Sequence, residues 1–308
     1  MILVIGRRYR LTRWDRAGTI VTRSIDYVTN WKQFCDILWR LSQLSRAQLG
    51  FDMTAERILP GSIQYRRMDE AALDDDDDVD HEERLLGKDE VPPDDPMWVY
   101  VRKKFGETLV DSWPRYRLQV PDGSNLKMRS FLVGRPVFRA PGMAGRGTRG
   151  YIALDCATGG FVWLKDAWRA KYLGVEPEGA VLEKLAGVSN VPTLVCHGDL
   201  TGQVTIAAEW WIRKHRSPAE AAPNDGQPVA STSRIPAGEP AASSGSSQRK
   251  RTYDEMALGT DPLSDCPLRS HQHYRMVVKE VAMPLVDFKN GRQLVSVIFD
   301  CITGTSLF

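Results

Sequence analysis

Three glycines, a lysine and a glutamate are the residues whose types and spacing could do chemistry. Gly145, Gly147 and Gly150 form the pattern G-x-G-x-x-G, Lys165 ends an apolar run, and Glu178 opens a later amphipathic segment. Glycine lets backbone N–H groups approach anionic oxygens closely, and lysine adds a positive charge. Together these residues predict a site for the phosphate groups of a nucleotide.

The elements next to the glycines distinguish two kinds of nucleotide site. A dinucleotide-binding loop leaves a strand and opens a helix. Here residues 151–155 and 161–165 both have the pattern of strands, with a Thr-Gly-Gly turn at 158–160 between them. A glycine loop that leads into a strand pair is how protein kinases cover the phosphates of ATP. A dinucleotide-binding enzyme is therefore the weakest alternative, whereas an ordinary Gly-rich hairpin without a ligand stays open.

Lys165 would need an acidic partner to orient it. The sequence predicts a helix with Pro177 in its first turn and Gly187 as its stop. Its apolar face consists of Val181, Leu182 and Leu185. Glu178 shares this face, where a carboxylate is costly unless it is paired. We therefore expect an ion pair between Lys165 and Glu178; the alternative is that Glu178 only stabilises the helix N-terminus.

Two later segments concern the metal and the base of a nucleotide. Cys196-His-Gly-Asp-Leu200 is similar to the catalytic loop of small-molecule kinases, but the position five after Asp199 is Val204, which cannot bind Mg²⁺. We therefore interpret 191–196 as a strand and 197–199 as its turn. Residues 274–279 predict a further strand, after which the backbone of Glu280, Val281 and Ala282 would meet the edge of an adenine.

The charge is unevenly distributed along the chain. The formal net charge is +2, from 41 Lys and Arg against 39 Asp and Glu. Residues 69–95 hold fourteen acids and two bases, so this window carries −12 and the other residues carry +14. Like-charge blocks of this density usually stay solvated. We expect an acidic disordered loop at 69–96, either as a plain insertion or as a partner for basic surfaces.

A second predicted disordered insertion spans residues 214–271, which are rich in Pro, Ala, Ser and Gly. The basic cluster at 248–251 within it could be a nuclear import signal. No run approaches the roughly 18 apolar residues of a membrane span. The five cysteines form no C-x-x-C pair, which argues for a reducing compartment. We expect an intracellular protein, cytoplasmic or nuclear, with neither a membrane nor a nucleic acid as partner.

The remaining segments complete the expected domain organisation. An amino-terminal extension at 1–68 contains strands at 2–5 and 19–22, a turn at 15–18, and a helix after Asn30. Its predicted core stripe consists of Trp31, Phe34, Leu38 and Leu41. A β-rich connecting part at 97–133 contains a hairpin formed by 115–120 and 126–133. Residues 134–308 form the part that carries the nucleotide site.

Several of these segments, in this order, resemble the fungal-type protein kinase family. They are Arg13–Thr22, Arg146–Gly150, Leu164–Arg169, Glu178-Gly179 and His273-Tyr-Arg275. The resemblance implies an α+β fold: a kinase-like amino-terminal lobe, with a mainly antiparallel sheet and one helix, preceded by an α/β extension. It also implies ATP with Mg²⁺ as cofactor and phosphoryl transfer to Ser or Thr of a protein substrate.

The sequence departs from this family in two ways. The catalytic loop and the Mg²⁺-binding aspartate should follow the last helix, but the chain ends at Phe308. We therefore expect no catalytic and no metal-binding residues here, a lobe truncated before the catalytic loop, and no kinase activity from this chain alone. The alternative is a non-catalytic, pseudokinase-like binding or scaffold module. Trp163 shares a face with Lys165, where most kinases carry a small residue against adenine.

Overall fold

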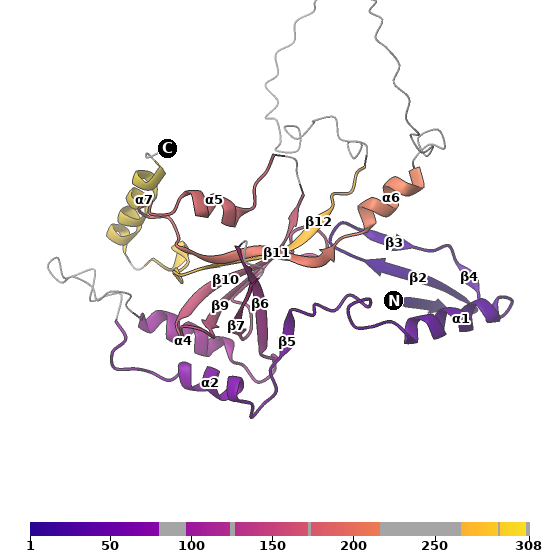
Figure 1. Ribbon diagram of the computed structural model, residues 1–308, viewed down its shortest axis with the longest axis horizontal. Coiled ribbons are helices and arrows are strands. Elements are labelled where there is room, and N and C mark those ends of the chain that lie inside the picture. Colours follow the sequence, from indigo (N-terminus) through magenta and orange to yellow (C-terminus); the bar gives the residue numbers. More distant parts are fainter. Residues whose placement is uncertain (80–96, 124–126, 172–173, 216–265, 289, 306–308) are drawn as a thin grey trace, which may run out of the picture.

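The computed structural model describes residues 1–79, 97–123, 127–171, 174–215, 266–288 and 290–305. Its centre is a large antiparallel sheet in the order β11-β12-β10-β9-β7-β6-β5, with β8 also paired to β9 (Figure 1). The strands are β5 (Ala55–Arg57), β6 (Tyr116–Asp122), β7 (Lys127–Val133), β8 (Phe138–Arg139), β9 (Arg149–Asp155), β10 (Phe161–Ala170), β11 (Leu194–Val204) and β12 (His271–Val278). The predicted mixture of helices with a mainly antiparallel sheet is confirmed.

The sheet curls around an apolar interior. Side chains alternate between faces along each strand, and one face of β6, β7, β9, β10 and β12 supplies a buried cluster that includes Val120, Phe131, Leu164 and Val277. Strand β6 packs against β11 across this interior. At the closest point a side chain at Gly198 would overlap the ring of Pro121. Glycine is needed at position 198 because β11 and β6 approach closely there.

Helices cover the outer face of the sheet in two places. Helices α2 (Ile63–Ala71) and α4 (Val99–Thr108) bury Met68 and Phe105 against Leu154 and Phe161 of β9 and β10. Helix α5 (Glu178–Lys184) lies over β12, where Leu182 packs on a separate apolar cluster. The two covered areas lie on either side of the middle of β10, where the predicted site residues are found.

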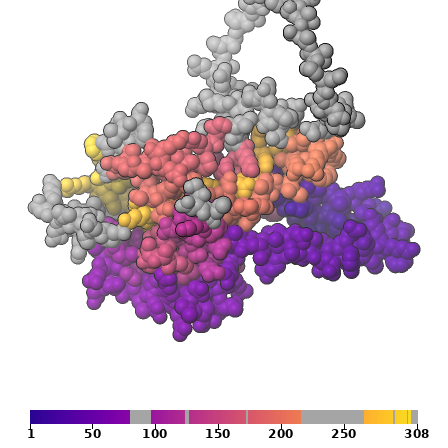
Figure 2. Space-filling model, in the orientation of Figure 1, coloured from indigo at the N-terminus to yellow at the C-terminus, as the bar shows by residue number. Residues whose placement is uncertain are grey.

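The amino-terminal residues form a small unit beside the main sheet (Figures 1 and 2). It contains β1 (Ile2–Ile5), β2 (Arg8–Trp14), β3 (Thr19–Val21), β4 (Ile25–Asp26) and α1 (Trp31–Ser42). The predicted turn is present, because the Asp15 N–H donates to the Gly18 carbonyl at 3.0 Å. The predicted core stripe of α1 is wrong, since Trp31 is 58% exposed and Leu38 is 44% exposed. Phe34 of that stripe contacts Tyr9 with tilted rings, at 4.8 Å between ring centroids.

Parts of the two predicted disordered insertions have a defined structure. Helix α2 extends to Ala71, and Asp78 forms an ion pair with Arg102 of α4. Helix α6 (Ala207–His215) contains the first residues of the second insertion, and residues 266–270 lead into β12. Residues 80–96 and 216–265, which include the basic cluster at 248–251, lie outside the described residues.

Two further elements follow or correct the predicted pattern. The hairpin expected at 115–133 is confirmed as the pair β6–β7. The turn expected at 197–199 is wrong, because β11 runs through these residues with irregular pairing to β12 on either side. After β12 the chain forms a short 3₁₀ helix at Leu285–Asp287 and then α7 (Gly291–Thr305).

Candidate functional site

Lys165 and Glu178 form an ion pair on the outer face of the sheet. Lys165 is in the middle of β10, opposite Gly150 of β9 and Met276 of β12. Glu178 is the first residue of α5. The lysine and glutamate side chains are 29% and 51% exposed, so solvent and small ions can reach both. The pair that the sequence predicts is therefore present, and its carboxylate holds the ammonium group beside the glycine loop.

The docking of α5 places Glu178 opposite β10. The N–H of Gly179 donates to the hydroxyl of Tyr274 in β12 at 2.9 Å. A side chain at Gly179 would overlap the ring of His197 in β11, so only glycine lets the helix come this close. His197 also contacts the carboxylate of Glu183 at 3.1 Å. Contacts at both ends of α5 thus fix the helix over β11 and β12.

The predicted glycines have different structural roles. Gly145 and Gly147 lie in the loop between β8 and β9, with φ of +81° and +50°, which are costly for other residues. Gly150 is already part of β9, and a side chain there would overlap the indole of Trp163. The glycine at position 150 is therefore explained by its tryptophan neighbour across the strand pair.

Trp163 fills the middle of the outer face. Its indole packs against the cluster under α4, which includes Val281, and also against the cluster under α5, which includes Leu182. It also lies over Gly150, next to the cavity that contains Lys165. Val281, from the segment that was expected to form the adenine edge, packs on the same cluster as the indole.

Two adjoining cavities share the Lys165–Glu178 pair and Thr148 of the glycine loop. The first, about 520 Å³, extends toward Trp163 and Met276. The second, about 470 Å³, extends toward Arg146 and Arg169. The second cavity carries three cationic side chains, which suits anionic oxygens.

The predicted adenine-edge residues lie elsewhere. Val281 lines a separate cavity of about 770 Å³ together with Glu280, Trp98 and Phe161. The Glu280 carboxylate accepts a hydrogen bond from the Thr193 N–H at 2.7 Å, and Ala282 is exposed. Neither cavity at Lys165 is lined by these three residues. Their assignment to nucleotide binding stays a prediction.

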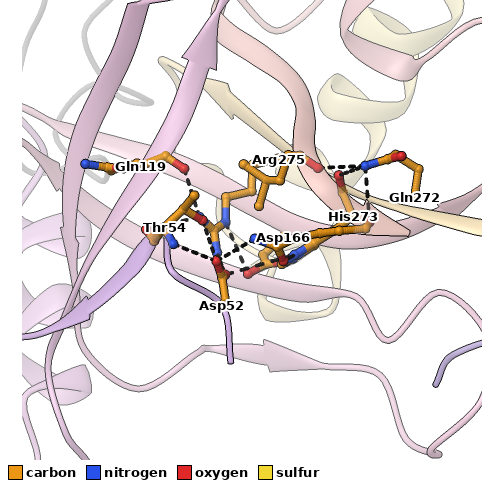
Figure 3. A network of polar contacts seen from close by, with 9 residues as sticks. Asp52, Thr54, Gln119, Asp166, Gln272, His273 and Arg275 are labelled. Carbon is orange, nitrogen blue, oxygen red and sulfur yellow. Dashed lines mark hydrogen bonds and ion pairs between the residues drawn. The ribbon is translucent and has the colours of Figure 1, made fainter. Parts of the chain in front are cut away.

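A buried polar network on the inner face was missed by the sequence analysis (Figure 3). Asp166, the neighbour of Lys165, points into the curled sheet and contacts His273 and Arg275 of β12. Arg275 is 1% exposed and also pairs with Asp52. It donates to the hydroxyl of Thr54 and to the carbonyl of Gln119, both at 2.8 Å. The network thus joins β10 and β12 to the segment that precedes β5.

Both ring nitrogens of His273 have partners in this network. Gln203 donates its amide to Asp52 at 2.7 Å, so its amide oxygen faces Nδ1 of His273 at 2.6 Å. The other ring nitrogen, Nε2, faces the carboxylate of Asp166. Each ring nitrogen of His273 therefore has an oxygen partner. Asp52, Asp166, His273 and Arg275 thus form one connected group.

The two carboxylates of this network, Asp52 and Asp166, have lowered pKa values. Burial raises the pKa of Asp166, but the hydrogen bond from His273 and the charge of Arg275 outweigh it and lower the pKa to about 2. The pKa of Asp52 is also lowered, because Arg275, Thr54 and Gln203 together outweigh its burial. Both residues are therefore ionised at neutral pH, as the pairing with His273 and Arg275 requires.

A comparison with protein-family models matches residues 2–308 to the model described as fungal protein kinase. The chain belongs to this family. The curated proteins gave no match, and the solved structures gave none either. Membership confirms the resemblance drawn from the sequence motifs, and in the family ATP and Mg²⁺ are the general cofactors and proteins are the substrates.

The family's cofactors differ in how well the described residues fit them. Phosphate groups suit the cations around Lys165. Mg²⁺ prefers several carboxylate or carbonyl oxygens, and the nearest carboxylates, Glu176 and Glu178, are paired with Lys184 and Lys165. No group of three or more His, Cys, Asp or Glu side chains suited to a metal ion occurs in the described part of the chain. Over the same residues, no helix combines the length and apolar character needed to cross a bilayer.

Proposed function

We propose that this chain binds ATP as the nucleotide-binding lobe of a protein kinase, in the family's phosphoryl transfer to Ser or Thr of a protein. The observation that carries the proposal is the Lys165–Glu178 ion pair, which lies beside the glycine loop because Lys165 pairs with Gly150 on the neighbouring strand. In kinases a lysine on such a strand holds the phosphates and a helix glutamate orients it. Lys165 and the loop would receive the phosphates between them.

The order of elements along the chain supports a kinase-type lobe. A strand, the glycine loop and β9 are followed by β10 with Lys165, by α5 with Glu178, and then by β11 and β12. In the sheet β12 lies between β10 and β11, and the glycine loop lies on the other side of β10. This arrangement brings the lysine, the glutamate and the loop together at one point of the outer face.

We propose further that binding, and not phosphoryl transfer, is what the residues of this chain accomplish by themselves. Phosphoryl transfer depends on Mg²⁺ to neutralise charge and on a residue that positions the nucleophile. The described residues near Lys165 offer cations, and their carboxylates are already paired. Lys165 and Arg146 would hold anionic oxygens, and Glu178 would orient Lys165.

Calorimetric titration with ATP, with and without Mg²⁺, tests this proposal. Wild type is expected to bind, and Lys165→Ala is expected to lose the binding because the ammonium group is gone. Lys104→Ala is a matched control: it removes another lysine paired with a glutamate, Glu107, and neither residue lines the two cavities at Lys165. Equal binding by wild type and Lys165→Ala would rule out the proposed phosphate site.

A non-catalytic binding module is the second candidate, and Trp163 favours it. The indole packs between the two apolar clusters, on the strand face where most kinases carry a small residue against adenine. Trp163→Ala separates the candidates. If the lobe binds nucleotides, the Trp163→Ala variant should bind ATP at least as tightly as wild type. If neither protein binds ATP at millimolar concentration, the scaffold role is supported.

A further inference from the structure

The amino-terminal unit touches the glycine loop through Arg16. The guanidinium group of Arg16 donates to the carbonyls of Gly142 and Met143, at 3.1 and 3.2 Å. In return, the N–H of Gly145 donates to the backbone carbonyl of Arg16 at 2.9 Å. Hydrogen bonds therefore run in both directions between the turn at 15–18 and the loop.

Arg16 also shapes the loop by packing. A Cβ atom at Gly147 would overlap the guanidinium group of Arg16, whereas a Cβ atom at Gly145 would meet open space. Both glycines have positive φ, +81° at Gly145 and +50° at Gly147. Both positions therefore have a positive φ, but only Gly147 lies against the Arg16 side chain.

The turn that carries Arg16 is itself held in place. One carboxylate oxygen of Asp15 accepts from the N–H groups of Ala17 and Gly18, at 2.9 and 3.0 Å. The other oxygen accepts from the N–H groups of Ile206 and Ala207 at the start of α6, at 2.8 and 2.9 Å. Asp15 therefore closes its own turn and fixes it to the start of α6. The backbone of Arg16, which lies in this turn, is fixed with it.

The far side of the loop is fixed to the strand that carries Lys165. The N–H of Trp168 in β10 donates to the carbonyl of Arg146 at 2.7 Å, and the N–H of Ala140 donates to the carbonyl of Thr148 at 2.8 Å. The loop is thus held between Arg16 on one side and β10 on the other. Arg146 and Thr148, from this loop, line the cavity that contains Lys165.

We propose that Arg16 is a positioning residue: the amino-terminal unit uses its side chain to hold the glycine loop in the shape that presents Arg146 and Thr148 to Lys165. The effect on the loop is independent of any ligand, whereas the effect on phosphate binding rests on the function proposed above. Because the guanidinium group bonds to Gly142 and Met143 and lies against Gly147, its loss should loosen the loop as a whole.

Hydrogen exchange of the free protein tests the hold on the loop. Arg16→Ala is expected to speed exchange of the Gly145 and Trp168 amides severalfold, because the two hydrogen bonds from the guanidinium group to Gly142 and Met143 are lost. Arg13→Ala is the matched control, since Arg13 is exposed and precedes the same turn. Millimolar guanidinium should restore slow exchange to Arg16→Ala, which a general loss of stability would not allow. Unchanged exchange in Arg16→Ala overturns the proposal.

A double-mutant cycle provides a second test that does not depend on nucleotide. Gly147→Ala should lower the denaturation midpoint more than Gly145→Ala in the wild-type background. With Arg16→Ala the excess should vanish, because the group that the new Cβ would meet is gone. An excess that persists without Arg16 contradicts the proposed packing.

ATP titration of the same variants links the loop to the site. Arg16→Ala should weaken binding severalfold and guanidinium should recover it, while Arg13→Ala should bind as wild type does. Faster exchange with unchanged ATP affinity overturns the positioning role. If wild type itself fails to bind ATP, the proposed function fails, and the exchange and cycle experiments still decide whether Arg16 holds the loop.

Discussion

Lys165 and Asp166 are neighbours in β10, yet their side chains lie in contrasting surroundings. Lys165 points to the outer face and has one charged partner, which is half exposed. Asp166 points to the interior and is bound by His273 and Arg275, in a network that continues to Asp52. Strand alternation alone separates an accessible cation from a buried, fully paired anion. The outer pair is open to solvent, while the inner network joins β10 to β12 and to the segment before β5.

The largest effect is expected from removing Arg275. Arg275→Ala would leave Asp52 and Asp166 buried without their arginine, and breaking a buried pair in this way costs about 3–5 kcal/mol. Denaturant unfolding would measure the loss. The control is Arg169→Ala, which breaks a more exposed pair with Asp199 and should cost less than about 1 kcal/mol. A similar loss of stability in both variants would contradict the proposed difference between the buried network and the more exposed ion pair.

A second prediction concerns the packed part of the outer face. Gly150→Ala would force a methyl group into the indole of Trp163, and overpacking of this kind costs about 1–3 kcal/mol. Thermal or denaturant unfolding would show it. The cost should shrink when Trp163 is replaced by leucine in the same chain. If Gly150→Ala is neutral, Trp163 does not fill this space in solution.

The inner network should also make stability depend on pH in the acid range. The pKa of Asp166 falls from an ordinary 3.8 to about 2 in the folded protein. The folded state therefore favours the carboxylate, and this stabilisation is complete above the ordinary value and lost as the pH falls toward 2. It amounts to about 2 kcal/mol. Unfolding measured between pH 5 and pH 2 should show a flatter acid limb in Asp166→Asn, and parallel limbs would contradict the assignment.

The smallest stability effect is expected at Lys165. An ion pair as exposed as Lys165–Glu178 contributes less than about 1 kcal/mol, so Lys165→Met should unfold almost as wild type does. ATP binding, measured on the same sample, should be lost. A large loss of stability with ATP binding retained would contradict the assignment of Lys165 to ligand binding.

Local sequence patterns were sufficient to predict part of the fold and of the candidate site. Strand alternation around Lys165, and the amphipathic pattern of residues 178–185, predicted the ion pair with Glu178 because each element forms from its own residues. The β6–β7 hairpin follows from its turn residues in the same way. The family motifs are short, and their order along the chain led to the same assignment as the family comparison.

Long-range contacts account for what could not be predicted. Arg16 reaches Met143 across 127 positions, and Arg275 reaches Asp52 across 223. No periodicity or spacing joins such residues, although His273-Tyr-Arg275 stood out as a motif. The prediction for helix α1 was wrong for another reason: its apolar stripe faces a small unit, where Tyr9 and Tyr27 contact Phe34 but Trp31 and Leu38 stay exposed. An apolar stripe predicts burial only if enough neighbouring surface exists to cover it.

The contact between Gly150 and Trp163 has a consequence for the evolution of the family. Each residue limits the other: glycine at position 150 accommodates the indole, and a smaller residue at 163 would release position 150 from this limit. We therefore expect the two positions to vary together. Relatives that replace the tryptophan should tolerate larger residues at position 150, and a larger residue at position 150 should appear only where position 163 is already smaller.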